Sequence, residues 1–208
     1  IKEVKVENGY TSESTGSVEE GFTITNSRTP SKIEVEVMKD WQDNKDQDGI
    51  RPESITVQLF ADGEATGKEK ILSAATNWQA VFTDLDEFKA GTQIVYTVVE
   101  KEVAGYTAEV TGTVKDGYVV TNTHKPEVIE LSGEKTWDDN DNQDGKRPES
   151  ISVRLLANGR EVANKVVTAG EDGKWTYTFT DLPKFEAGKA INYTVQEDVV
   201  KEYTTVVN

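Results

Sequence analysis

The chain has 208 residues, no cysteine and a formal net charge of -15 at pH 7. The absence of cysteine excludes disulfides, thiolate metal sites and cysteine nucleophiles, and the acidic charge argues against nucleic acid and anionic membrane surfaces as partners. No apolar run approaches the roughly 18 residues of a membrane span and no signal peptide opens the sequence. We therefore expect an internal piece of a longer protein, with any secretion or anchoring signal outside it.

The first 30 residues match a later part of the chain. "NGYTSESTGSVEEGFTITNSRTP" (8–30) corresponds to "AGYTAEVTGTVKDGYVVTNTHKP" (104–126), an offset of 96 positions, and the same offset relates "MKDWQDNKDQDGIRPES" (38–54) to "EKTWDDNDNQDGKRPES" (134–150). The linkers "SRTPSK" and "THKPEV" both contain proline, which stiffens a joint. The expected domains are the C-terminal strands of a preceding repeat (1–30), a complete repeat (31–126) and a further repeat truncated before its last strand (127–208).

Alternating apolar residues predict strands in every repeat. Residues 55–59 and 151–155 alternate between apolar and polar, and each segment runs into a turn, "ADGE" or "ANGR", that is typical of a hairpin. No segment shows a sustained helical period. Short alternating strands separated by turn signals predict an all-β fold of tandem β-sandwich domains.

The acidic stretch before the first of these hairpins does not fit an EF-hand. Such a loop needs a glycine at position 6 and a bidentate glutamate at position 12. Counting from Asn44 or Asn140 places glycine correctly, but position 12 is Ile55 or Ile151. We predict an exposed acidic turn joining two strands, with a looser cation site as the weaker alternative, and we expect no cofactor.

Three kinds of polar residue fall on the apolar face of their strands. Side chains alternate faces along a strand, so residues two apart share a face. The residues in phase with apolar neighbours are Lys39, Glu100 and Asn122 in the middle repeat, Lys135 and Glu197 in the third, and Asn26 in the leading fragment. Buried charges are costly unless paired and buried amides need hydrogen bonds, so we expect these groups to meet inside each repeat.

Two interpretations of this polar cluster stay open at the level of the sequence. One is a satisfied hydrogen-bond network, or strand ends whose polar tips reach solvent. The other is a reactive site, because an apolar environment favours a neutral lysine amine, which is a nucleophile, and a protonated glutamic acid. Attack of the amine on the asparagine side-chain carbon would expel ammonia and leave an isopeptide bond, with the glutamic acid as proton shuttle.

The motifs resemble a known family. "KTWDDNDNQDGKRPESISVRLLANG", "KWTYTFTDLPKFEAGKAINYTVQE" and "GYVVTNTH" are similar to the B-type repeat of the collagen-adhesin family of Gram-positive surface proteins, and the resemblance covers the whole chain. It implies prealbumin-like, reverse-immunoglobulin sandwiches of about seven strands, in extracellular stalks anchored to the cell wall. It also implies an isopeptide bond between the first and last strands of a repeat.

The resemblance assigns roles residue by residue. In the middle repeat Lys39 is the amine, Asn122 the acceptor and Glu100 the acid and base. The third repeat supplies Lys135 and Glu197 without an acceptor inside the chain. The leading fragment supplies Asn26 and Glu3. The spacing from Glu3 to the following Gly-Tyr pair is one residue longer than in the other copies.

Other functions compete with a structural stalk. A ligand-binding adhesin module or a pilin-like subunit would need a binding surface, but the four tryptophans recur at repeat-equivalent positions, which favours repeat packing. A turnover enzyme is not expected, because the lone His124 lies in a linker and no nucleophile–base motif occurs. Expected partners are neighbouring repeats, a second chain whose leading strands complete the third repeat head to tail, and host extracellular matrix through other regions of the parent.

Overall fold

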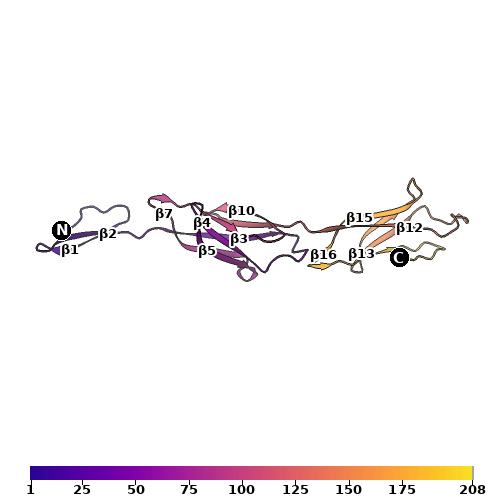
Figure 1. Cartoon of the computed structure of the whole chain (residues 1–208), viewed down its shortest axis with the longest axis horizontal. Coiled ribbons are helices and arrows are strands. Elements are labelled where there is room, and N and C mark those ends of the chain that lie inside the picture. Colours follow the sequence, from indigo (N-terminus) through magenta and orange to yellow (C-terminus); the bar gives the residue numbers. More distant parts are fainter. Residues whose placement is uncertain (208) are drawn as a thin grey trace. The chain divides into compact units, whose positions relative to one another are not determined.

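The computed structural model describes residues 1–207, and its regular structure is almost entirely β-strand (Figure 1). By residue contact the chain forms two compact units. Unit 1 contains residues 1–40, 53–104 and 108–121, and unit 2 contains residues 41–52, 105–107 and the chain from residue 122 onward. No helix among residues 1–207 has the length and apolar character needed to cross a bilayer. The predicted all-β fold is confirmed.

The leading fragment forms one antiparallel hairpin in unit 1. Strand β1 (Thr11–Ser17) pairs with β2 (Gly21–Ser27), with Thr11 opposite Ser27. Phe22 and Ile24 share a face of β2, yet they are 41% and 44% exposed. The fragment therefore holds the strand pattern of a repeat without the core that would cover it.

The middle repeat contributes nine strands and one short 3-10 turn. They are β3 (Lys32–Gln42), β4 (Ser54–Ala61), β5 (Glu64–Ser73), η1 (Ala74–Thr76), β6 (Gln79–Asp86), β7 (Phe88–Lys89), β8 (Thr92–Gln93), β9 (Tyr96–Glu100), β10 (Thr107–Thr113) and β11 (Gly117–Thr123). One sheet has the order β10-β11-β3-β6, a second has the order β5-β4-β9, and β7 and β8 form a small hairpin.

The core of the middle repeat comes from the alternation seen in the sequence. Every second residue of β4, from Ile55 through Val57 to Leu59, is at most 3% exposed, as are Val35, Val37 and Phe82 from the other sheet. The predicted hairpin turn between β4 and β5 is confirmed. It places Asp62 and Gly63 at φ values of 51° and 84°, the left-handed region that such turns require.

The third repeat contributes seven strands. They are β12 (Val128–Lys135), β13 (Ile151–Ala157), β14 (Arg160–Val167), β15 (Trp175–Pro183), β16 (Phe185–Glu186), β17 (Lys189–Ala190) and β18 (Tyr193–Glu197). The sheets are β12-β15, β14-β13-β18 and the hairpin β16-β17. Up to residue 207, β12 pairs with β15 alone, whereas its equivalent β3 lies between β6 and β11.

The two repeats fill equivalent parts of their cores with opposite size patterns. In the middle repeat Val37 lies opposite Ala80, and in the third repeat Gly133 lies opposite Tyr177. A Cβ on Gly133 would overlap the Tyr177 ring. The larger residue of the opposed pair is therefore on β3 in the middle repeat and on β15 in the third, and each is matched by a small residue on the partner strand.

Candidate functional site

The first candidate cluster surrounds Lys39 near the end of β3. Its side chain is fully buried, and its Nζ lies 3.8 Å from Oε1 of Glu100, whose side chain is 1% exposed. The same Nζ donates hydrogen bonds to the carbonyl oxygens of Asp40 and Val120 at 2.8 and 3.0 Å. The amine thus sits among oxygen acceptors in a site that solvent does not reach.

Two further strands carry the predicted residues Glu100 and Asn122. Glu100 ends β9 and lies opposite Val57 of the central strand β4, which places its carboxyl group at the core. Asn122 lies in β11 with 0% of its surface exposed. It follows Val120 by two positions, so both side chains occupy the same face of β11, and the Val120 carbonyl is the one that accepts from Lys39.

The third repeat brings together the equivalent lysine and glutamate. Lys135 Nζ lies 3.1 Å from Oε2 of Glu197, with the two side chains 16% and 5% exposed. The Thr205 hydroxyl donates to the same carboxylate oxygen, and Lys135 Nζ lies 4.5 Å from the centre of the Trp137 ring. Glu197 Oε1 is buried and has no hydrogen-bond partner in the part of the chain that the structure describes.

In the leading fragment Asn26 and Glu3 also meet. The Asn26 amide donates to Glu3 Oε1 at 3.4 Å, and Ser12 donates to Glu3 Oε2 at 2.9 Å. Asn26 is exposed, because among the described residues β2 pairs only with β1. Asn26 therefore lies on the face of β2 that the sequence predicts to be buried, but in residues 1–207 no core covers that face.

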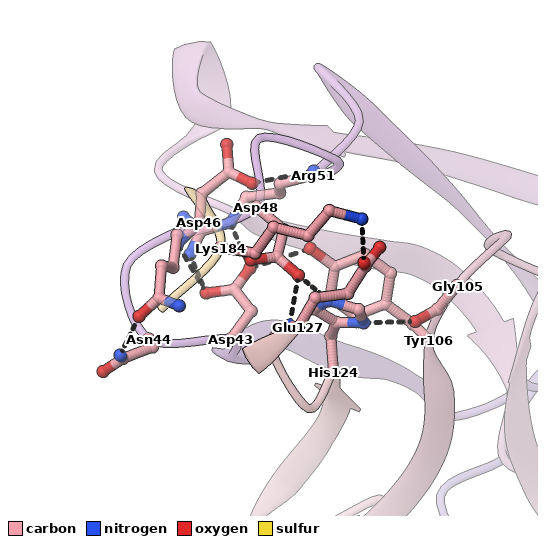
Figure 2. Close-up of polar contacts among 11 residues, drawn as sticks. Asp43, Asn44, Asp46, Asp48, Arg51, Gly105, Tyr106, His124, Glu127 and Lys184 are labelled. Atoms are coloured by element: carbon pink, nitrogen blue, oxygen red, sulfur yellow. Dashed lines mark hydrogen bonds and ion pairs between the residues drawn. The ribbon is translucent and has the colours of Figure 1, made fainter. Parts of the chain in front are cut away.

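The acidic loop of unit 2 is built around a buried carboxylate (Figure 2). Asp43 is 1% exposed, which overturns the expectation of an exposed turn at this position. Its carboxylate accepts hydrogen bonds from Nε and Nη2 of Arg51 at 2.8 and 2.5 Å, from the Tyr106 hydroxyl at 2.9 Å and from the backbone N–H of Asp46 at 2.9 Å. We call this arrangement the Asp–Arg–Tyr clasp.

The clasp controls the charge of its members. Burial opposes ionisation of Asp43, but the hydrogen bonds from Arg51, the Asp46 backbone and Tyr106 outweigh it and lower the pKa of Asp43 to about 2. Burial and the nearby carboxylate raise the pKa of Tyr106. Hydrogen-bond donors of the chain itself occupy the Asp43 carboxylate. The stretch is therefore as acidic as a cation-binding loop but does not have the ligand geometry of one.

The third repeat contains the same clasp. Asp139 accepts hydrogen bonds from Arg147 Nε at 3.0 Å and from the Tyr203 hydroxyl at 3.0 Å, and the Arg147 hydrogen bonds lower its pKa. Trp137 packs edge to face on Tyr203, as Trp41 does on Tyr106, each at 5.0 Å between ring centres. The sequence patterns described above do not include the arginine and tyrosine of the clasp. Both recur at equivalent positions of the two repeats, and this recurrence could have identified them.

Comparisons with known proteins agree with this geometry. The Cna protein B-type domain family matches residues 35–123 and 131–208. The collagen adhesin of Staphylococcus aureus is 51% identical over 189 residues, which are 90% of this chain and 16% of that protein. The crystal structure of two B repeat units of the collagen-binding protein of Staphylococcus aureus aligns with a TM-score of 0.82 at 48% identity, over 98% of this chain and 53% of that chain. The chain thus spans about half of that structure and a small part of the adhesin.

Proposed function

The chain belongs to the family of Cna protein B-type domains, and from that premise we propose that it is a structural spacer in the stalk of an extracellular, cell-wall-anchored adhesin. The proposed domains are the end of one repeat (1–30), a complete repeat (31–126) and a third repeat (127–208). Support comes from tandem repeats of paired strands, each with an aspartate–arginine clasp that is satisfied within the chain. The anchor and any contact with host matrix would belong to other parts of the parent protein.

We further propose that Lys39 and Asn122 become joined by an isopeptide bond. The observation that carries this proposal is the buried Lys39–Glu100 pair, with side chains 0% and 1% exposed. Lys39 is on β3, and the neighbouring strand β11 carries the buried Asn122. A low-dielectric site disfavours an ammonium and a carboxylate relative to the neutral amine and acid. Transfer of a proton from Lys39 to Glu100 would therefore give an uncharged nucleophile beside an uncharged acid.

The reaction balances without any other reagent. Lys39 Nζ forms a bond to Cγ of Asn122, and the bond between Cγ and Nδ2 breaks. The protonated Glu100 polarises the carboxamide and gives its proton to the departing nitrogen, which leaves as ammonia, and the resulting carboxylate takes the surplus proton from the attacking nitrogen. The carbonyl oxygens of Asp40 and Val120 hold the amine in place, so the fold supplies the proximity that makes a single turnover fast enough.

Such a bond suits a load-bearing spacer. Tension enters a repeat through its first strand and leaves through its last, and a covalent tie between β3 and β11 would carry that load directly. The tie closes a loop of nearly the whole repeat, which by analogy with disulfide loop closure stabilises the folded state by roughly 4–5 kcal/mol. It needs no cysteine and hence no oxidising compartment.

The third repeat supports a second, intermolecular proposal. Up to residue 207 the edge of β12 carries Lys135 with Glu197 and lacks a β11-type strand, whereas β2 has the corresponding sequence with Asn26 and partly exposed Phe22 and Ile24. We propose that β2 of a second copy can add to β12 and bring Asn26 to Lys135, with Glu197, or the Glu3 that arrives with it, as the acid. Concentration-dependent covalent dimers on a denaturing gel, absent in Asn26→Ala, are expected; a purely monomeric species at all concentrations would contradict it.

The intact mass of the denatured chain tests the intramolecular bond. We expect a deficit of one ammonia in the wild type, and no deficit in Lys39→Ala or Glu100→Gln after allowing for each substitution. The repeat-equivalent changes Lys135→Ala and Glu197→Gln are the matched controls and should keep the deficit. A full wild-type mass would reduce the cluster to a polar network.

A further inference from the structure

The acidic loop of the middle repeat also holds the linker that follows that repeat, within unit 2 (Figure 2). Asp48 Oδ2 lies 2.9 Å from Nε2 of His124 and accepts the backbone N–H of Glu127 at 2.8 Å. His124 Nδ1 lies 2.9 Å from the carbonyl oxygen of Gly105. Because both ring nitrogens face acceptors, both must donate, and the geometry requires the doubly protonated, cationic imidazole.

The same loop touches a hairpin of the third repeat. The Gly188 N–H, in the turn between β16 and β17, donates to the Gln47 carbonyl at 3.0 Å. Gly49 and Gly188 have φ values of 68° and 74°, and a Cβ on Gly49 would overlap the Gly188 backbone. Two glycines are needed here, both for their backbone conformation and for the close approach of two main chains.

A comparison of equivalent positions distinguishes the contacts that each repeat makes by itself from the contacts made only where one repeat is followed by the next. Asp144, the counterpart of Asp48, is exposed although the clasp beside it is intact. A Cβ added to Gly91, the counterpart of Gly188, would meet no described atom within 4 Å. The linker position of His124 is occupied by Arg28 in the leading fragment, so both linkers carry a side chain that can be cationic.

We propose that the loop 43–51 is a socket for an inter-repeat joint, in which Asp48 binds a cationic side chain of the following linker and Gly49 receives the glycine hairpin of the following repeat. The clasp formed by Asp43, Arg51 and Tyr106 holds the socket rigid. The equivalent loop 139–147 is then a second socket. The partner that fits it is another repeat of this kind, with Arg or His in its linker and glycine at the hairpin position of Gly188.

A histidine makes this particular joint sensitive to pH. The groups facing the His124 ring are the Asp48 carboxylate, the Gly105 carbonyl and the Tyr106 ring, with Asp43 behind them. The hydrogen bond from Asp48 raises the pKa of His124 above its ordinary 6.5. The contribution to the joint is therefore complete below about pH 6.5 and is lost as pH rises through the raised pKa. A joint with arginine at the position of His124 would keep this contribution over the same pH range.

The lone histidine allows a direct test by NMR on the full chain. We expect the His124 ring to titrate above the ordinary value in the wild type, and to return toward it in Asp48→Asn but not in the matched control Asp144→Asn. Amide exchange protection of Gly188 and Glu127 should fall by roughly tenfold or more in Asp48→Asn. His124→Arg should keep that protection as pH rises, while the wild type loses it.

Two results would overturn the socket. One is unchanged protection of Gly188 in Asp48→Asn that has kept its fold; the other is an equal loss of protection in Asp144→Asn. The intact mass of each sample, read in parallel, keeps this outcome separate from the proposed crosslink, because Asp48, Asp144 and His124 take no part in that reaction.

Discussion

The middle and third repeats place an equivalent lysine and glutamate on equivalent strands, but within residues 1–207 β3 is paired on both sides and β12 on one. In the middle repeat the lysine and glutamate side chains are 0% and 1% exposed and their charged atoms are 3.8 Å apart. In the third repeat they are 16% and 5% exposed, and the pair closes to 3.1 Å. The added strand β11 therefore does more than bury the lysine: its Val120 carbonyl draws the amine away from the glutamate.

This difference shows how the last strand of a repeat changes the surroundings of the lysine. In the third repeat, as far as residue 207, the lysine forms a direct ion pair with the glutamate, and the lysine side chain is 16% exposed. In the middle repeat the lysine is fully buried and donates to two carbonyl oxygens, one of which, that of Val120, is on β11. The proposed reaction would therefore take both its acceptor and its dry environment from one strand, β11.

The largest effect should come from removing the lysine in each repeat. Lys39→Ala would lose the proposed crosslink, worth roughly 4–5 kcal/mol of unfolding free energy, and would leave Glu100 buried without its amine. Lys135→Ala also leaves a nearly buried carboxylate without its amine, but no crosslink is lost, so its cost should be smaller than that of Lys39→Ala. Denaturant unfolding of both variants measures the contrast, and equal losses would contradict it.

The clasp gives the next largest effect. Asp43→Ala removes a buried carboxylate and leaves Arg51 and Tyr106 without their acceptor, which should cost about 3 kcal/mol. Asp139→Ala is the matched change at a carboxylate that is 11% exposed, and a smaller loss is expected. Thermal unfolding of the two variants measures both losses of stability. A larger loss for Asp139→Ala would contradict our assignment of the tighter clasp to the middle repeat.

The exchanged core volumes can be tested by swapping them back. Gly133→Val should collide with Tyr177 and cost about 2 kcal/mol through overpacking. Adding Tyr177→Ala restores the size pattern of Val37 and Ala80, so the double variant should recover most of that loss. Unfolding free energies from a double-mutant cycle measure the coupling, and additive losses would mean that the two positions do not share one volume.

The smallest effect is the acid response of the clasp. The folded pKa of Asp43 is lowered to about 2 from an ordinary 3.8, so its contribution to stability is present above about pH 3.8 and is lost as pH falls through 2. In Asp43→Asn this part of the pH dependence should vanish. Unfolding free energies measured between pH 5 and 2 check it; an unchanged slope in the variant would show that other carboxylates carry the acid response.

The sequence predicts much of the fold because its signals are local. Alternation at residues 55–59 and the turn at Asp62 and Gly63 depend on neighbours in the chain, and both are confirmed. The clasp was missed because Tyr106 reaches Asp43 from 63 positions away, and no periodicity records such a contact. His124 was set aside as a linker residue for the same reason: its partner Asp48 lies 76 positions earlier.

The most direct test of the central claim is a peptide map of the wild-type chain by tandem mass spectrometry. We predict one branched peptide that joins the segment containing Lys39 to the segment containing Asn122, lighter by one ammonia than the sum of the two. Lys135 should appear in an ordinary linear peptide when the chain is monomeric. Recovery of Lys39 and Asn122 in two separate linear peptides would contradict the account, because the sealed site would then be a polar network without covalent chemistry.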